Sequence, residues 1–124
     1  DPFDGCYERY ASATALVKMV SAVDPSLTNG RQIFANLERP EIKAVVNKWI
    51  DEIVLGLATL IHIFNPSCVV LGGGIMVQPY ILEQIHARIP QMVMSSFAHV
   101  QISSAELGNS AGLLGAYYLA SQKL

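Results

Sequence analysis

Apolar residues recur at steps of three and four along much of this chain, which is the period of α-helices that bury one side. Residues 6–23 show this pattern first, and the pattern ends at Asp24-Pro25 because the residue before a proline disfavours helical backbone. A second, short helix is predicted over residues 29–37, with Asn29 as its candidate N-cap. The N-terminal part of the chain is therefore predicted to be helical.

The longest helix is predicted to run from Pro40 to about Asn65. Proline is tolerated in a first helical turn, and Asn65-Pro66 stops the pattern at the other end. Charged residues line one face in the first half of this helix, but beyond Val54 that polar face fades. We therefore expect the second half to be buried nearly all round.

Two short segments have the patterns of β-strands. Cys68–Leu71 is apolar throughout, as in a strand buried on both faces, and Val100–Ser103 alternates apolar and polar residues. Further helices are predicted over 79–89, stopping at Pro90, and over 110–121. This order indicates an α/β fold that is rich in helix. Because two strands cannot cover so much apolar helix surface, we expect the missing strands in a preceding segment.

Composition and charge narrow the class of protein. Of the 124 residues 52% are apolar and 15% charged, which predicts a large core or a face covered by another part of a protein. The net charge of −2 and the lack of a Lys/Arg run argue against direct contact with nucleic acid. The longest apolar run, residues 53–64, is shorter than the ~20 residues that a membrane span needs. The two cysteines are far apart and are expected to be reduced, which indicates the cytoplasm.

The triple glycine Gly72 to Gly74, directly after the first strand, is the first candidate for chemistry. Without Cβ atoms the backbone can approach a phosphate or ribose closely and can point its N–H groups at an anion. The segment matches neither a Walker A loop nor the spaced-glycine dinucleotide motif. A tight turn at the end of a strand is the alternative interpretation.

Glu8, in the first turn of the first helix and close to Cys6, is the second candidate. A carboxylate at that place is also favoured by the helix dipole alone. The histidines have no metal-ligand spacing: His62 is expected to be a hydrogen-bonded core residue, and His86 and His99 are expected at the surface. No serine has a nearby histidine and acid, so a hydrolase triad has no support.

Three blocks of residues resemble one family, the ROK family of repressors, open reading frames and kinases. They are Gly5-Cys6-Tyr7-Glu8 followed by Tyr10-Ala11-Ser12, then Phe64-Asn65-Pro66 with Val69 to Ile75, and finally Leu107 to Ala116. The blocks occur in order and span almost the whole chain. The resemblance implies the C-terminal part of an actin-like ATPase (ribonuclease H-like) fold. Residues 1–124 would form the C-terminal portion of a sugar kinase domain whose N-terminal lobe lies outside this chain, and we interpret the start at Asp1-Pro2 as a fragment boundary.

The resemblance also implies roles for particular residues. Glu8 matches the glutamate that hydrogen-bonds sugar hydroxyls, and Gly72 to Gly74 match the loop against the adenosine and ribose of the nucleotide. Cys6 matches the last cysteine of a structural zinc site, but Asp1 and Pro2 stand where the second cysteine and its glycine would be. One thiol cannot make a four-ligand site, so we expect no metal here. The family's aspartate base and phosphate loop lie in the N-terminal half, so no catalytic residue is expected in this chain.

The function that follows is part of an ATP-dependent kinase that phosphorylates a hexose or an amino sugar, as glucokinases, fructokinases and N-acetylmannosamine kinases do. ATP and Mg²⁺ would be its cofactors, and its partners would be the sugar, the missing lobe and a second copy of the protein. The 124-residue chain alone is expected to be inactive. One alternative is the sugar-sensing domain of a ROK transcriptional repressor, and another is a purely structural oligomerisation domain.

Overall fold

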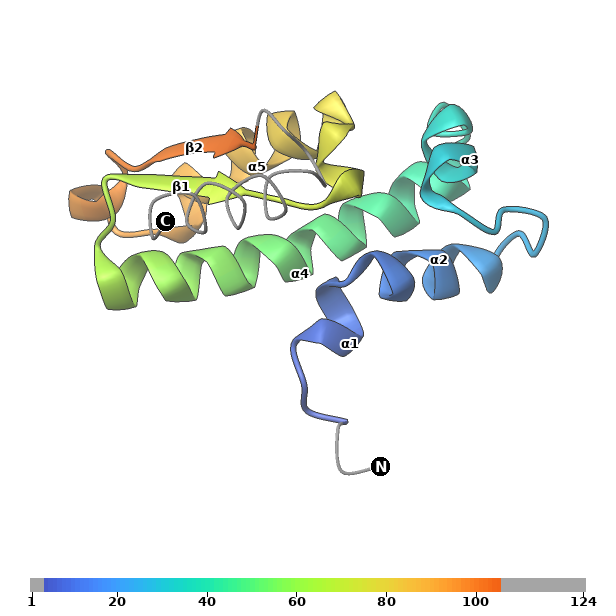
Figure 1. Ribbon diagram of the computed structural model, residues 1–124, viewed down its shortest axis with the longest axis horizontal. Helices are drawn as coiled ribbons and strands as arrows, with labels where there is room; N and C mark the ends of the chain where they lie inside the picture. Colours follow the sequence, from blue (N-terminus) through green and yellow to red (C-terminus); the bar gives the residue numbers. More distant parts are fainter. Residues whose placement is uncertain (1–3, 106–124) are drawn as a thin grey trace, which may run out of the picture.

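The structure is a computed structural model that describes residues 4–105 of the chain. Helices dominate it, and the two described strands lie beside the C-terminal half of the longest helix (Figure 1). In chain order the elements are α1 (Glu8–Ala11), α2 (Ala13–Ser21), α3 (Gly30–Ala35), α4 (Pro40–Phe64), β1 (Cys68–Leu71), the 3-10 helix η1 (Gly74–Val77), α5 (Pro79–Met92), the 3-10 helix η2 (Ser95–Phe97) and β2 (Gln101–Ser104). The helix predicted over 110–121 and the third block of the resemblance lie outside the described residues.

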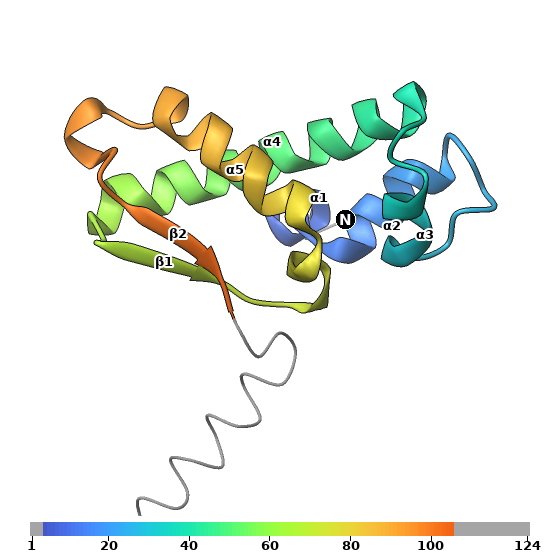
Figure 2. The ribbon, with the colours of Figure 1, turned by 90° about the horizontal axis from the view of Figure 1, so that it is seen from above.

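The two strands pair in parallel, with Cys68 opposite Gln101 and Leu71 opposite Ser104. A parallel pair needs a long connection between its strands, and α5 provides it. Figure 2 shows α4 and α5 on the same side of the strand pair. The predicted α/β order is therefore confirmed for the described part of the chain.

One face of the strand pair is open, contrary to the prediction that β1 is buried on both sides. Val69 and Leu71 pack against the hydrophobic core, whereas Cys68 is exposed and Val70 keeps 61% of its surface accessible. The prediction was wrong because, among the described residues, helices cover only one face of these strands.

The C-terminal half of α4 differs from its prediction for the same reason. Leu57, Ala58 and Ile61 are buried, but an opposite side remains open in the described part of the chain. The exposed apolar residues of that side are Leu55, Leu60, Ile63 and Phe64, with 51–71% of their surface accessible. An apolar sequence therefore does not mean burial all round here.

The first predicted helix is two helices, because the chain bends at Ser12. Its φ of −76° and ψ of 161° are extended, so α1 ends there and α2 begins at Ala13. The Ser12 hydroxyl accepts a hydrogen bond from the Ala15 N–H at 3.1 Å, which caps α2. The Trp49 indole N–H donates to the Ser12 carbonyl at 2.9 Å. The bend is thus fixed both by its own cap and by α4.

The predicted helix ends are confirmed where local chemistry decides them. The Asn29 side chain accepts from the Gln32 N–H at 2.9 Å and caps α3. Asn65 ends α4 in a left-handed conformation with φ of 45°. Pro90, however, does not end α5, which continues to Met92. A proline removes one helical donor but leaves the other hydrogen bonds of the last turn available, so the prediction placed this end too early.

A single hydrophobic cluster joins α2, α3, α4, α5 and the strands. Its largest fully buried side chains are Trp49, Leu16, Ile33, Ile42, Ile50, Ile61, Ile81 and Ile85. Within residues 4–105 no helix is long and apolar enough to cross a membrane.

Candidate functional site

The triple glycine leads from the end of β1 into η1. β2 ends beside β1, and the Ala105 N–H donates to the Leu71 carbonyl at 2.9 Å. The glycines therefore leave the sheet at the carboxyl edge of the parallel pair, which is where α/β sheets present ligands. Gly73 has φ of 105° and ψ of 151°, which residues with a side chain rarely adopt. A Cβ added at Gly72 or Gly73 would meet no other atom within 4 Å, so the space around both is open.

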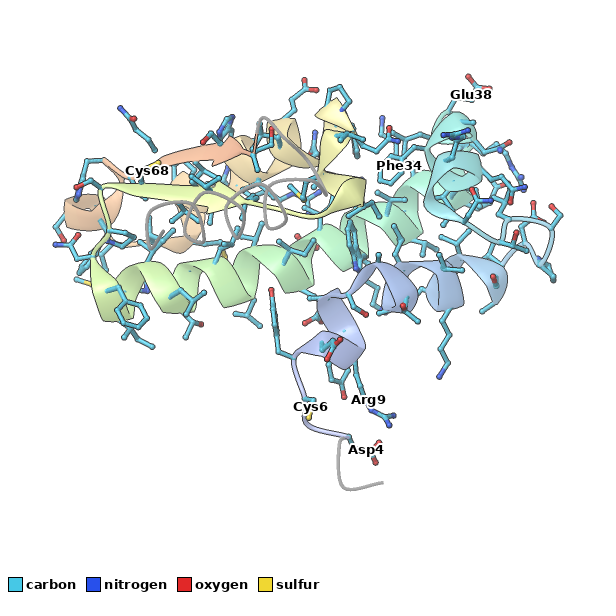
Figure 3. The ribbon with its side chains drawn as sticks, viewed as in Figure 1. Asp4, Cys6, Arg9, Phe34, Glu38 and Cys68 are labelled. Atoms are coloured by element: carbon cyan, nitrogen blue, oxygen red, sulfur yellow. The ribbon has the colours of Figure 1, made fainter. Side chains whose placement is uncertain are left out.

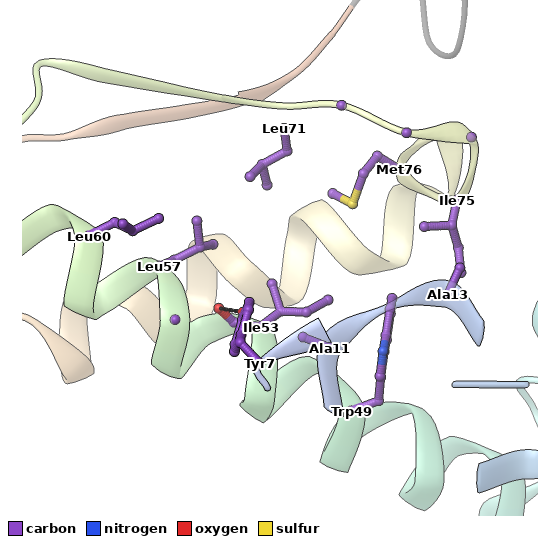
Figure 4. Close-up of a pocket in the computed structure, with 14 residues that line it drawn as sticks. Tyr7, Ala11, Ala13, Trp49, Ile53, Leu57, Leu60, Leu71, Ile75 and Met76 are labelled. Carbon is purple, nitrogen blue, oxygen red and sulfur yellow. Dashed lines mark hydrogen bonds between the residues drawn. The ribbon is translucent and has the colours of Figure 1, made fainter. Parts of the chain in front are cut away.

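Below this loop lies a cavity of about 420 Å³, bounded by α1, α4 and the loop itself (Figure 4). We call it the glycine-loop cavity. It is lined by Tyr7, Ala11, Ala13, Trp49, Ile53, Gly56, Leu57, Leu60, Leu71 and Gly72 to Met76. The volume lies within the ~300–1,000 Å³ range typical of ligand sites. None of these lining residues is charged, so the side chains of the cavity suit an apolar or planar group.

Glu8 belongs to a second hollow of about 460 Å³, which we call the Glu8 cleft. It is lined by Cys6, Glu8, Arg9, Ser12, Thr14, Ala15 and Lys18. Glu8 is exposed, as are Thr14 and Lys18. A carboxylate accepts hydrogen bonds, whereas hydroxyl and ammonium groups donate them. This combination suits a ligand that carries several hydroxyl groups.

The structure does not bring Glu8 and the three glycines into one cavity. They line two different hollows, and α1 contributes to both of them. Tyr7 lines the glycine-loop cavity, whereas its neighbour Glu8 lines the Glu8 cleft. The short helix α1 is therefore the element that the two candidate sites share.

Tyr7 joins α1 to α4, although the sequence analysis did not single it out. Its hydroxyl donates to the Ile53 carbonyl at 3.1 Å, and its ring lies so close to Gly56 that a Cβ there would overlap it. Burial, and then the nearby Glu52 carboxylate, raise the pKa of Tyr7 above its usual value. The sequence signal for this contact was Gly56 itself, since a glycine inside a helix often has a packing reason.

The histidines and cysteines form no further site in the part of the chain that the structure describes. The His62 Nε2 accepts from the Met94 N–H at 3.1 Å, and its ring lies edge-on to Phe97 with centroids 5.1 Å apart. The predicted hydrogen bond of His62 is confirmed, but its predicted burial is wrong because the side of α4 on which it lies is open. His86 and His99 are exposed, as predicted.

Cys6 and Cys68 are free and exposed, and Figure 3 shows them on separate parts of the molecule. Among residues 4–105 no three His, Cys, Asp or Glu side chains lie together as metal ligands would. Cys6 therefore has no described partners with which to complete a zinc site.

Comparison with known proteins gives similarity along nearly the full chain. N-acetyl-D-glucosamine kinase of Yersinia enterocolitica is 29% identical over 118 residues, which cover 94% of this chain and 39% of that protein. Beta-glucoside kinase of Listeria innocua is 36% identical over 92 residues, covering 72% of this chain and 30% of that kinase. The chain thus spans well under half the length of these relatives.

Two solved structures are also similar to this chain along nearly its full length. A ROK family glucokinase from Streptomyces griseus, in complex with glucose and AMPPNP, matches 95% of this chain and 45% of its own chain, with a TM-score of 0.83 at 27% identity. The ROK hexokinase from Thermus thermophilus matches 97% of this chain and 42% of its own, with a TM-score of 0.72 at 28% identity. The expected fold class, part of an actin-like ATPase fold with few strands, is confirmed. The model of the ROK family matches residues 2–123, and the chain therefore belongs to the ROK family.

Proposed function

We propose that this chain is the C-terminal part of an ATP-dependent sugar kinase that phosphorylates a hexose or an amino sugar. The observation that carries the proposal is the match of 95% of the chain to a glucokinase complex with glucose and AMPPNP. The curated relatives act on N-acetyl-D-glucosamine and on beta-glucosides, which fits the same class of substrate.

In this proposal the Glu8 cleft holds part of the sugar. The Glu8 carboxylate accepts hydrogen bonds from sugar hydroxyls, and hydrogen bonds to a charged acceptor are stronger than those between neutral groups. Ser12, Thr14 and Lys18 line the same cleft and can contribute further polar contacts. One carboxylate cannot select among sugars that differ at several carbons, so the proposal stays at the level of hexoses and amino sugars.

The glycine loop holds the adenosine side of ATP. Open space at Gly72 and Gly73 lets the main chain lie directly against a ribose or a base, and the uncharged cavity below accepts a planar group. Mg²⁺ prefers carboxylate and phosphate oxygens, and no carboxylate lines this cavity among the described residues. We infer that the Mg²⁺ ligands, the phosphate contacts and the catalytic base belong to the rest of the kinase.

Nucleotide binding separates this proposal from the repressor alternative. The complete protein should phosphorylate at least one member of a panel of hexoses and amino sugars in a coupled ADP-release assay with MgATP. Titration calorimetry should also detect a non-hydrolysable ATP analogue and the sugar. A complete protein that binds sugar but no nucleotide at millimolar concentration would contradict the kinase and support a sugar-sensing repressor.

A further inference from the structure

Helix α1, which carries Glu8, cannot hold its own position. It has only four residues and no buried side chain. A helix of one turn is unstable alone because nucleation fixes several residues for a single hydrogen bond. The direction in which Glu8 points must therefore be set by contacts at the two ends of α1.

The C-terminal end of α1 is held by Trp49. Its indole N–H donates to the Ser12 carbonyl at 2.9 Å, and the side chain itself is 1% exposed. Because α2 begins directly after Ser12, this contact fixes the bend between the two helices. The Trp49 contact does not fix the N-terminal end of α1, so a second contact is needed there.

Tyr7 is that second contact. The Tyr7 hydroxyl donates to the Ile53 carbonyl at 3.1 Å, and Figure 4 shows the ring beside α4 on the wall of the glycine-loop cavity. The ring reaches this place only because Gly56 has no Cβ. Glycine is less favourable than alanine inside a helix, so Gly56 weakens α4 but makes room for the Tyr7 ring.

We infer that Tyr7, seated on Gly56, is the positioning residue that holds Glu8 toward the sugar. Tyr7 contacts no reacting atom itself; it acts because it precedes Glu8 directly in the chain and fixes the start of α1 to α4. The same ring lines the glycine-loop cavity, so it also ties the sugar-contacting helix to the nucleotide side. This inference rests on the proposed sugar kinase function.

A double-mutant cycle in the complete kinase tests the inference. Tyr7→Ala and Gly56→Ala should each raise the KM for the sugar at least tenfold, and by more than any change in the KM for ATP, whose proposed cavity both residues line. The two changes together should raise the sugar KM no further than one alone, because both remove the same contact. Tyr7→Phe, which keeps the ring on Gly56 but loses the hydroxyl, should restore most of the sugar affinity.

Tyr10→Ala is the matched control. Tyr10 lies on the same helix and is similarly exposed, but its hydroxyl donates to the nearby Asp4 carbonyl at 2.8 Å and does not reach α4. Its sugar KM should stay within twofold of the wild type.

Two results would overturn the inference in different ways. In the first, Tyr7→Ala and Gly56→Ala lower the melting temperature but leave the sugar KM unchanged. Tyr7 would then stabilise the fold of a working kinase without positioning Glu8. A wild-type protein that phosphorylates no sugar would instead remove the proposed function, and the positioning role with it.

Discussion

At the scale of single residues, Glu8 is the side chain whose role is most directly measurable. If the complete protein is the proposed kinase, Glu8→Ala in it should weaken sugar use by about 1.5–3 kcal/mol, the worth of a hydrogen bond to a charged group. Steady-state kinetics should show this loss in kcat/KM for the sugar, with little change in the KM for ATP. Glu38→Ala is a matched control, because Glu38 does not line the Glu8 cleft and Figure 3 shows it near the top of the view, whereas the cleft residues Cys6 and Arg9 lie near the bottom. Unaltered sugar kinetics with lower stability would make Glu8 only a helix-end carboxylate.

Gly73 is the residue of the glycine loop with the most restrictive backbone. Gly73→Val in the complete protein should reduce ATP affinity at least tenfold, or ~1.4 kcal/mol, while sugar binding survives. The valine side chain would occupy the open space around residue 73, and the φ of 105° there would also strain the backbone of any residue that has a side chain. Gly72→Val separates the two effects, since the φ of Gly72 is not positive and its surroundings are equally open.

Titration calorimetry with a non-hydrolysable ATP analogue measures both variants, and a parallel titration with the sugar serves as the control. If Gly72→Val keeps full nucleotide affinity, the loop does not lie against the nucleotide. It would then be a turn that needs glycine at residue 73 for its backbone alone.

At the scale of elements, the bend between α1 and α2 depends on Ser12. Ser12→Ala removes the hydroxyl that caps α2 but keeps the carbonyl that Trp49 binds. Loss of an N-cap costs about 0.5–2 kcal/mol, so urea unfolding of the 124-residue chain should show a stability lower by that amount. Ser12→Asn retains a capping side chain and should restore most of the loss. Equal stability of Ser12→Ala and the wild type would mean that Trp49 alone holds the bend.

Sequence predicted the elements that local chemistry decides. The cap at Asn29, the stop at Asn65-Pro66 and the extent of α4 followed from residue type and period alone. The break at Ser12 was missed because the apolar period runs on across it, while a cap and a hydrogen bond from a distant tryptophan decide the bend. Contacts between residues far apart in the chain do not change the local pattern of apolar and polar residues, so that pattern did not indicate the break.

Burial was less predictable than secondary structure. The second half of α4 and the strand β1 each pack one side against the core, but the opposite sides, which were also predicted to be buried, are exposed at Leu60 and Val70. An apolar sequence shows that a segment can be buried, but it does not show which neighbouring element covers each side of that segment. The candidate site was predictable only as separate residues, because the contact of Tyr7 with Gly56 joins positions far apart in the chain.

At the scale of the whole molecule, the chain alone should have no kinase activity. Phosphoryl transfer needs a base near the sugar hydroxyl together with phosphate and Mg²⁺ contacts, which we assign to another part of the protein. A coupled ADP-release assay of the 124-residue chain with MgATP and a hexose panel should give no sugar-dependent turnover. Turnover well above the blank would contradict our assignment of the catalytic base to another part of the protein. The complete protein, assayed in parallel, is the control, and the proposed function predicts turnover there.

The parallel pairing of β1 with β2 has a consequence for the order in which the molecule folds. Helical hydrogen bonds link near neighbours and can form soon after their residues leave the ribosome, whereas β1 has no described partner until β2 has been synthesised beyond α5. Closing that long loop costs entropy before the strand pairing offsets it. The packing of α5 on α4 brings the strands together and lowers this cost. The sheet edge that carries the glycine loop is therefore among the last parts of the described chain to form during synthesis.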